Sequence, residues 1–173
     1  MLKILVLFAN GTEEIEGLTP VDVLRRAGVD CDLVSVSGRN PIGSHNISVK
    51  ADKVIEEITF SDYDGVVIPG GMPGAVNISN NKKVIDGIKE FLSSEKLVCA
   101  ICASPAVVLA NNNLLNAESA TCYPAPQFVS ALGDKYTGKD VEVCNNIITA
   151  NGPKSAMVFS LAICDYLKVK PKF

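Results

Sequence analysis

The strongest constraint on the fold is an alternation of strand-like apolar runs with helix-like segments along the chain. Residues 3–9 form a continuous apolar run, as expected of a strand that is buried on both faces. Residues 13–28 follow with apolar side chains at helical spacing, acidic residues near the start and two arginines near the end, which are helix start and stop signals. The alternation predicts one doubly wound α/β domain over residues 1–173, with a mainly parallel sheet flanked by helices.

The same patterns predict the remaining elements. Further strands are expected over 30–37, 63–71, 96–101 and 118–124, with a short strand and connector within 40–58. A hairpin is expected over 141–150, with Asn145 and Asn146 suited to positive φ. Further helices are expected over 81–96, 104–113, 126–133 and 152–168.

Composition excludes several classes of function. The net charge is −3 and the Lys and Arg residues are scattered, which argues against a nucleic-acid surface. No apolar stretch approaches the roughly 18 residues that a membrane span needs. The apolar run at residues 4–9 is too short for a signal segment, so we expect a cytoplasmic protein. The six cysteines are best interpreted as free thiols in a chain that is long enough to fold around its own core.

Sites in doubly wound sheets form beyond the carboxyl ends of strands, which singles out the segments after Phe8, Ile68 and Ile101. The first segment places Glu13, Glu14 and Glu16 in the first turn of a helix. Glu13 and Glu14 are typical of charges that complement the helix dipole.

Glu16 differs from its two acidic neighbours. With Ile15 and Leu18 expected to face inward, Glu16 falls near the edge of the helix. From there it could lean over the end of the sheet.

The second segment contains Gly70, Gly71 and Gly74. These glycines match neither the dinucleotide fingerprint nor the P-loop. Two interpretations stay open, a tight turn and an anion hole built from backbone N–H groups.

The third segment places Cys102 where a strand turns sharply into a helix. Such a turn lifts a side chain out of the sheet, and the helix N-terminus would lower the pKa of a thiol there. Pro105 suits the first turn of that helix. We therefore expect Cys102 to be a reactive nucleophile, and Cys99, inside the strand, to be buried and inert.

Four segments, at residues 13–28, 64–75, 100–110 and 148–163, together resemble the DJ-1/ThiJ/PfpI superfamily, on its DJ-1 and bacterial ThiJ side. They run nearly end to end in the order and spacing of that superfamily. The resemblance implies a flavodoxin-like fold, a homodimer and chemistry without a cofactor. One histidine and dispersed cysteines do not make a zinc site, so we expect no metal.

The resemblance also implies roles for individual residues. The reactive cysteine of the superfamily corresponds to Cys102, and the acid that contacts it corresponds to Glu16. The backbone donors correspond to Gly70, Gly71 and the amide of Ala103. Burial beside a thiolate would raise the pKa of Glu16, so this carboxyl is expected to hold or share a proton.

Three further residues are candidates for the site or for a dimer interface. Arg26 corresponds to an arginine that approaches the site of the neighbouring subunit in the superfamily. Tyr123 stands where many members carry a histidine close to the cysteine, which disfavours the protease-like branch. His45, the single histidine, is expected to have a structural or interface role, and an approach to a site across a dimer stays open.

Two functions are compatible with this reading. The first is a glyoxalase that turns methylglyoxal into lactate, or a deglycase, with Cys102 as nucleophile and Glu16 as acid and base. The second is a non-enzymatic redox sensor or chaperone whose Cys102 is oxidised to a sulfinate. Its partners would then be a small aldehyde or an oxidant, together with a second copy of the chain.

Overall fold

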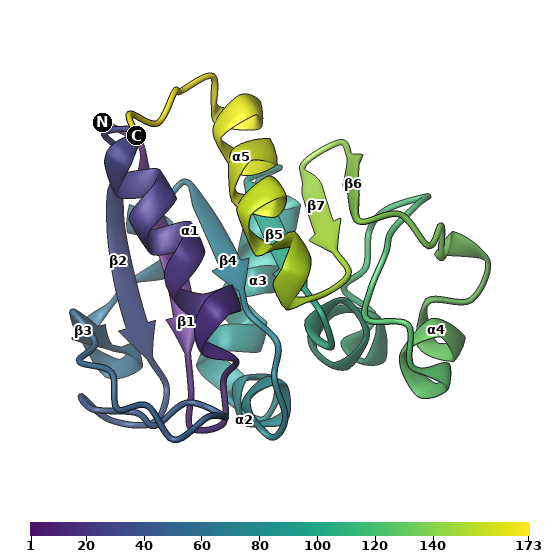
Figure 1. Ribbon diagram of the computed structural model, residues 1–173, viewed down its shortest axis with the longest axis horizontal. Coiled ribbons are helices and arrows are strands. Elements are labelled where there is room, and N and C mark those ends of the chain that lie inside the picture. The colour runs from purple at the N-terminus through teal and green to yellow at the C-terminus, as the bar shows by residue number, and fades with distance from the viewer.

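The computed structural model describes residues 1–173 and contains one seven-stranded sheet with helices on both faces (Figure 1). The strand order is β3-β2-β1-β4-β5-β7-β6, and every pairing is parallel except the β6–β7 hairpin. The strands are β1 (Lys3–Phe8), β2 (Asp30–Ser35), β3 (Lys53–Val54), β4 (Gly65–Ile68), β5 (Leu97–Ile101), β6 (Val141–Cys144) and β7 (Ile147–Ala150). The predicted doubly wound, mainly parallel sheet is confirmed.

The helices form two layers. In Figure 1, α1 and α5 lie side by side across one face of the sheet, and α3 lies behind it. The α-helices are α1 (Glu14–Arg26), α2 (Gly74–Ser79), α3 (Lys82–Ser93), α4 (Pro126–Leu132) and α5 (Ala156–Leu167). The short helix α2 falls in the glycine-containing segment after β4, for which no helix was predicted.

The pleat of the buried strands explains why both layers are held firmly. Ile4, Val6 and Phe8 of β1 pack in the cluster that includes α1 and α5, while Leu5 and Leu7 pack in the cluster on the opposite face. Because successive side chains in a strand point to opposite faces, a continuous apolar run supplies both clusters at once. The carboxyl ends of these rigid strands therefore give a fixed platform for a site.

The predicted strand over residues 118–124 is wrong. Only one isolated bridge forms there, between Ala120 and Tyr136. The Thr121 N–H donates to the Thr149 hydroxyl at 2.9 Å, and the Thr121 hydroxyl donates to the Lys139 carbonyl at 2.6 Å. Scattered hydrogen bonds to the backbones of Lys135, Thr137 and Cys102 and to the Thr149 side chain replace a ladder here, because the neighbouring position beside β7 is taken by β6.

The segment after β5 is helical but not a regular α-helix. It forms a π-helical turn at Pro105–Leu109 and a 3-10 turn at Ala110–Asn112, and it ends at Asn113 with φ of 56°. In the β6–β7 hairpin, Asn145 adopts φ of 54°, whereas Asn146 does not adopt the predicted positive φ.

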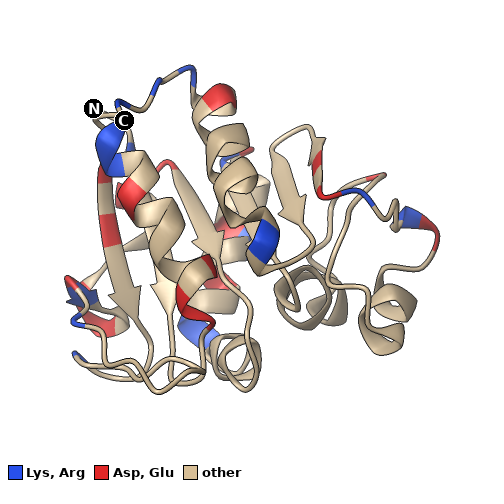
Figure 2. Ribbon diagram, in the orientation of Figure 1, with Lys and Arg blue, Asp and Glu red and all other residues tan.

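Acidic and basic residues are interspersed over the molecule, with no element carrying a long run of one sign (Figure 2). None of its helices combines the length and the apolar character that a membrane crossing requires.

Candidate active site

Cys102 lies immediately after β5 with φ of 65°, a left-handed conformation that non-glycine residues rarely adopt. Two hydrogen bonds hold it there. Its N–H donates to the Ala150 carbonyl of β7 at 2.9 Å, and its carbonyl accepts from the Tyr123 N–H at 2.8 Å. The half-buried thiol is therefore presented at the carboxyl edge of the sheet by a strained turn that its neighbours enforce.

The loop after β4 closes tightly around this turn. A Cβ atom on Gly70 would lie 2.6 Å from the Cβ of Cys102 and 3.0 Å from the amide nitrogen of Ala103. Gly71 adopts φ of 86°, and a Cβ there would lie 2.4 Å from the Glu13 nitrogen. These two glycines allow a close backbone approach that no larger residue permits.

Glu16 supplies the acid of the site from the first turn of α1. Its side chain is fully buried, and neither carboxyl oxygen has a hydrogen-bond partner of good geometry. Burial, followed by the negative charge of Glu13, raises the pKa of Glu16 to about 8, while the Cys102 thiol and the Gly70 backbone partly oppose the shift. Glu16 therefore holds its proton at neutral pH, in the direction that the sequence predicted.

The pKa of the Cys102 thiol is shifted in the direction opposite to the one that the sequence predicted. Burial, followed by the charge of Glu16, raises the pKa of Cys102 to about 12, while the backbones of Gly71 and Ala103 lower it in part. The predicted low pKa is wrong because desolvation outweighs the helix N-terminus, which here is only a π-helical turn. The contribution of Glu16 exists only while that carboxyl is ionised.

The first turn of α1 is arranged differently from the prediction. Glu13 is the N-cap of the helix and accepts a hydrogen bond from the Glu16 N–H at 3.1 Å. Ile15, expected to face inward, is 53% exposed. Because Ile15 faces solvent, the adjacent Glu16 points into the protein rather than along the edge of the helix.

Glu14 holds the loop that contains His45, in addition to placing a negative charge near the N-terminus of α1. It is buried and accepts hydrogen bonds from the His45 N–H and from His45 Nδ1, at 2.8 and 2.9 Å. His45 Nδ1 also lies 3.3 Å from Glu13, so the two acids and the histidine form one cluster of ligand-type atoms within 4.8 Å. These mutual contacts account for the cluster. The hydrogen bond to Glu14 raises the pKa of His45.

The two remaining sequence candidates lie in different places. Arg26 ends α1 at the edge of the sheet opposite Cys102, where it pairs with Asp22 at 2.9 Å and stacks on Phe173. It is not part of the site within one chain. The backbone N–H of Tyr123 donates to the Cys102 carbonyl, and the Tyr123 side chain is 46% exposed.

All six cysteines are free. Cys99 is fully buried inside β5, as predicted. Cys144 is half-exposed, and hydrogen bonds from the backbones of Ser119 and Glu118 lower its pKa.

Two pockets lie near segments that carry candidate site residues. One of about 560 Å³ lies at the end of β7 and contains Lys154, a residue that the sequence analysis did not single out. The same rule on strand ends would have found it, since Lys154 follows β7 by four residues. The hairpin pattern gave no sign that β7 joins the sheet beside β5.

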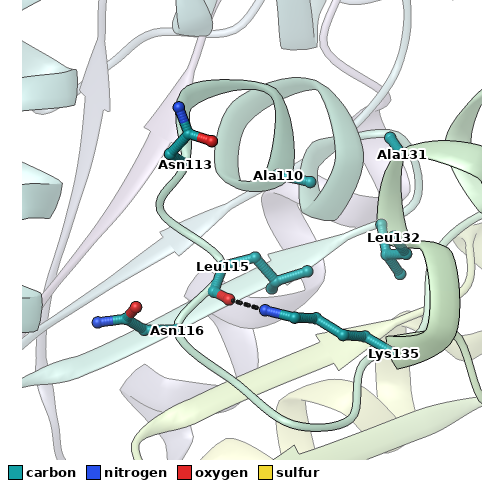
Figure 3. Close-up of a pocket in the computed structure, with 7 residues that line it drawn as sticks. All are labelled: Ala110, Asn113, Leu115, Asn116, Ala131, Leu132 and Lys135. Carbon is teal, nitrogen blue, oxygen red and sulfur yellow. Dashed lines mark hydrogen bonds between the residues drawn. The ribbon is translucent and has the colours of Figure 1, made fainter.

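The second pocket, of about 260 Å³, is formed largely by the end of the 105–112 segment, α4 and the turns that follow each of them (Figure 3). Lys135 spans it and donates to the Leu115 carbonyl at 2.6 Å. None of the candidate site residues lines it; its lining is Ala110, Asn113, Leu115, Asn116, Ala131, Leu132 and Lys135.

The sheet order and the cysteine at the turn after β5 define a flavodoxin-like α/β protein with a thiol–carboxyl pair at the carboxyl ends of its parallel strands. The model of the DJ-1/PfpI family matches residues 2–166. The chain therefore belongs to the DJ-1/PfpI family.

Individual relatives agree with this assignment. The chain is 33% identical to the Parkinson disease protein 7 homolog of Danio rerio, over 95% of this chain and 89% of that protein. It is 35% identical to the protein DJ-1 homolog B of Arabidopsis thaliana, over 98% of this chain but only 39% of that longer protein. The solved structure of oxidized Toxoplasma gondii DJ-1 has a TM-score of 0.92 and 39% identity, over 96% of this chain and 91% of that one.

Proposed function

We propose that this protein is a cofactor-independent enzyme of carbonyl stress, which converts methylglyoxal to lactate and acts as a deglycase on methylglyoxal adducts through the same thiol. The observation that carries the proposal is the strained turn that presents Cys102 beside the fully buried carboxyl of Glu16. Membership of the DJ-1/PfpI family supports it.

The first step is addition of the thiol to the aldehyde. Ionised Glu16 takes the thiol proton as Sγ of Cys102 forms a bond to the aldehyde carbon, and the carbonyl electron pair moves to oxygen. The backbones of Gly71 and Ala103, which already act on the thiol, would stabilise this oxyanion. Glu16 then returns the proton and leaves a hemithioacetal.

The second step is a proton transfer between two carbons. The Glu16 carboxylate removes the proton from the former aldehyde carbon, and the electron pair moves through the new C=C bond to the ketone oxygen to give an enediolate. The hydroxyl proton then passes from the first oxygen to the second, and Glu16 delivers its proton to the former ketone carbon as the thioester carbonyl forms. The product is a lactoyl thioester of Cys102, which water hydrolyses to lactate and the free thiol. The aldehyde carbon is oxidised and the ketone carbon is reduced, so no external oxidant or reductant is needed.

The active form in this scheme has Glu16 ionised and Cys102 protonated. Since the pKa of Glu16 is about 8 and that of Cys102 is about 12, this form is in the minority at neutral pH and grows as the pH rises. We therefore expect kcat/KM to increase with pH up to about 8, the pKa of Glu16, and then to level off.

The test is methylglyoxal turnover in the wild type, Cys102→Ser and Glu16→Gln, with lactate as the measured product. Both variants should lose at least about 100-fold in kcat/KM, as expected when a nucleophile or a general base is removed. Cys144→Ser, which changes a thiol outside the site, is the matched control and should retain turnover. Unchanged methylglyoxal turnover in Cys102→Ser would contradict the proposal.

A redox sensor or chaperone is the second candidate, favoured by the proton on Glu16. One peroxide would convert the thiol to a sulfenic acid and a second would convert that to a sulfinic acid, with water released each time. A sulfinate at Cys102 would accept hydrogen bonds from protonated Glu16 and the neighbouring amides. A solved relative is described as oxidized, which is compatible with this chemistry.

Mild peroxide followed by peptide mass spectrometry tests the second candidate. Cys144→Ser is the background for this test, because the lowered pKa of Cys144 makes it a competing target of peroxide. In that background Cys102 should gain two oxygens and stop there, and adding Glu16→Gln should change where the oxidation stops. Cys99 serves as the internal control, because its burial should keep it reduced. Even oxidation of all the remaining cysteines would argue against a sensor site.

We further propose that the chain forms a homodimer. Ile15 and Met157 are 53% and 46% exposed, and they lie in the first turns of α1 and α5, two helices that pack side by side. Large apolar side chains on neighbouring helices, pointing away from the sheet, are typical of an interface.

A further inference from the structure

A pocket of about 560 Å³ lies at the carboxyl end of β7 and extends to the start of α5. Pockets that bury drug-sized ligands have about 300–1,000 Å³, so this one has room for a ligand with more heavy atoms than the five of methylglyoxal. It is lined by Tyr123, Pro124, Asp140, Asn151, Gly152, Pro153, Lys154, Ser155 and Val158.

The pocket adjoins the turn that carries the reactive thiol. Tyr123, in its wall, donates its N–H to the Cys102 carbonyl, while Cys102 donates to Ala150 at the end of β7. Gly152 lies under the ring of Tyr123, since a Cβ there would be 3.3 Å from a ring carbon. Tyr123 thus joins the backbone of the turn at Cys102 to the wall of the pocket.

Most polar groups of the pocket satisfy one another. The Asn151 side chain donates to Asp140 at 3.0 Å and accepts from the Ser155 hydroxyl at 2.6 Å. Lys154 is the only cation in the lining, and its ammonium makes no hydrogen bond or ion pair with the protein. The start of α5 at Ala156 adds the positive end of a helix dipole nearby.

We propose that this pocket binds the carboxylate tail of α-oxoaldehyde substrates and that Lys154 is the residue that selects for the negative charge. This proposal rests on the proposed glyoxalase function and adds the substrate class. The carboxylate of Asp140 in the same wall repels a doubly charged phosphate tail more strongly than a singly charged carboxylate, so the preferred tail carries a single negative charge.

The kinetic test compares two substrates of equal chain length, 4,5-dioxovalerate with a carboxylate tail and 2-oxopentanal with an uncharged tail. The wild type should prefer the anion, and Lys154→Gln should lower the ratio of the two kcat/KM values by about two- to fivefold, the range for one exposed charge pair. The loss should fall in KM, and Lys154→Arg should keep the ratio. Lys168→Gln, which removes an exposed charge beyond the end of α5, is the matched control.

A binding test separates this proposal from the proposed enzymatic activity. Levulinate, an unreactive keto acid, is titrated into Cys102→Ala and followed by NMR chemical shifts. We expect shifts at Gly152 and Tyr123 that are absent with uncharged 2-pentanone and weakened by Lys154→Gln. If the wild type fails to turn over methylglyoxal while levulinate binds in this way, the activity is wrong and the anion pocket stands. Two results would overturn the pocket assignment. One is a ratio of the two kcat/KM values that does not change in Lys154→Gln, and the other is a set of levulinate-induced chemical shifts that is the same with and without Lys154.

Discussion

Glu16 is a carboxyl with no exposed surface that stands three residues from a second acid, Glu13. The raised pKa of Glu16 has a consequence for folding. Between its ordinary value of 4.5 and its folded value of about 8, the folded state keeps a proton that the unfolded state releases. The stabilising contribution of this proton is complete below pH 4.5 and is lost as the pH rises toward 8.

Glu16→Gln should therefore flatten the pH dependence of stability. The difference in unfolding free energy between the variant and the wild type should grow in favour of the variant, by up to about 1.4 kcal/mol for each pH unit between 5 and 8. Urea denaturation at several pH values measures it. His45, whose pKa is also raised, is present in both proteins and cancels in the difference. The exposed Glu56→Gln gives the control, and equal slopes in all three proteins would contradict the burial of a protonated Glu16.

The thiols of Cys102 and Cys144 are predicted to differ in reactivity at neutral pH. Burial raises the pKa of Cys102 to about 12, whereas backbone hydrogen bonds from Ser119 and Glu118 lower the pKa of half-exposed Cys144. Since the thiolate is the nucleophile, iodoacetamide at pH 7 should modify Cys144 at least about 100-fold faster than Cys102.

Peptide mass spectrometry over a time course follows both sites in this experiment. Cys144→Ser should abolish the fast phase and leave the slow labelling of Cys102 unchanged. Faster labelling of Cys102 than of Cys144 would restore the low pKa that the sequence indicated, and would mean that desolvation is not the dominant effect at the turn.

At the scale of elements, the site depends on how closely the loop after β4 approaches the turn after β5. Gly70→Ala would place a methyl group 2.6 Å from the Cβ of Cys102 and 2.9 Å from the Ile101 carbonyl, so one of the two segments must move. We expect methylglyoxal turnover to fall by at least about tenfold, because small displacements of a reacting group are costly.

Gly28→Ala is the matched control for this change. Gly28 has φ of 77° and open space around its Cβ position, so alanine there costs about 1–2 kcal/mol of backbone strain and leaves the site in place. Thermal unfolding and turnover are measured for both variants. A Gly70→Ala protein as active as Gly28→Ala would show that the loop does not set the geometry of the thiol.

The elements that sequence patterns predicted well are those whose apolar runs are long and buried. The strands ending at Phe8, Ile68 and Ile101 were placed correctly, and the turn at Cys102 followed from them. Side-chain direction near an element's end was predicted poorly, as the exposed Ile15 shows, because the N-cap and not the apolar spacing decides how the first turn of α1 is oriented. Lys154 was missed because the pairing of β7 with β5 is a tertiary contact that no local pattern encodes.

At the scale of the whole molecule, α1 and α5 cover one face of the sheet (Figure 1). Ile15 of α1 and Met157 of α5 are exposed apolar side chains on these helices. Met157→Lys would place a charge on α5 without touching the core, since the side chain is 46% exposed. A charge buried in an apolar interface without a partner is strongly unfavourable, so we expect the dimer to dissociate to monomer.

Light scattering coupled to size-exclusion chromatography measures the mass, and circular dichroism checks that the variant stays folded. Val143→Lys is the matched control, because Val143 is 50% exposed on β6, at the other edge of the molecule from α1. That variant should keep the mass of the dimer. Two results would contradict the proposed interface: a wild type that is a monomer, or a Met157→Lys variant that keeps the mass of the dimer as Val143→Lys does. In either case the outer surface of α1 and α5 is not the interface, and the exposure of Ile15 and Met157 has another cause.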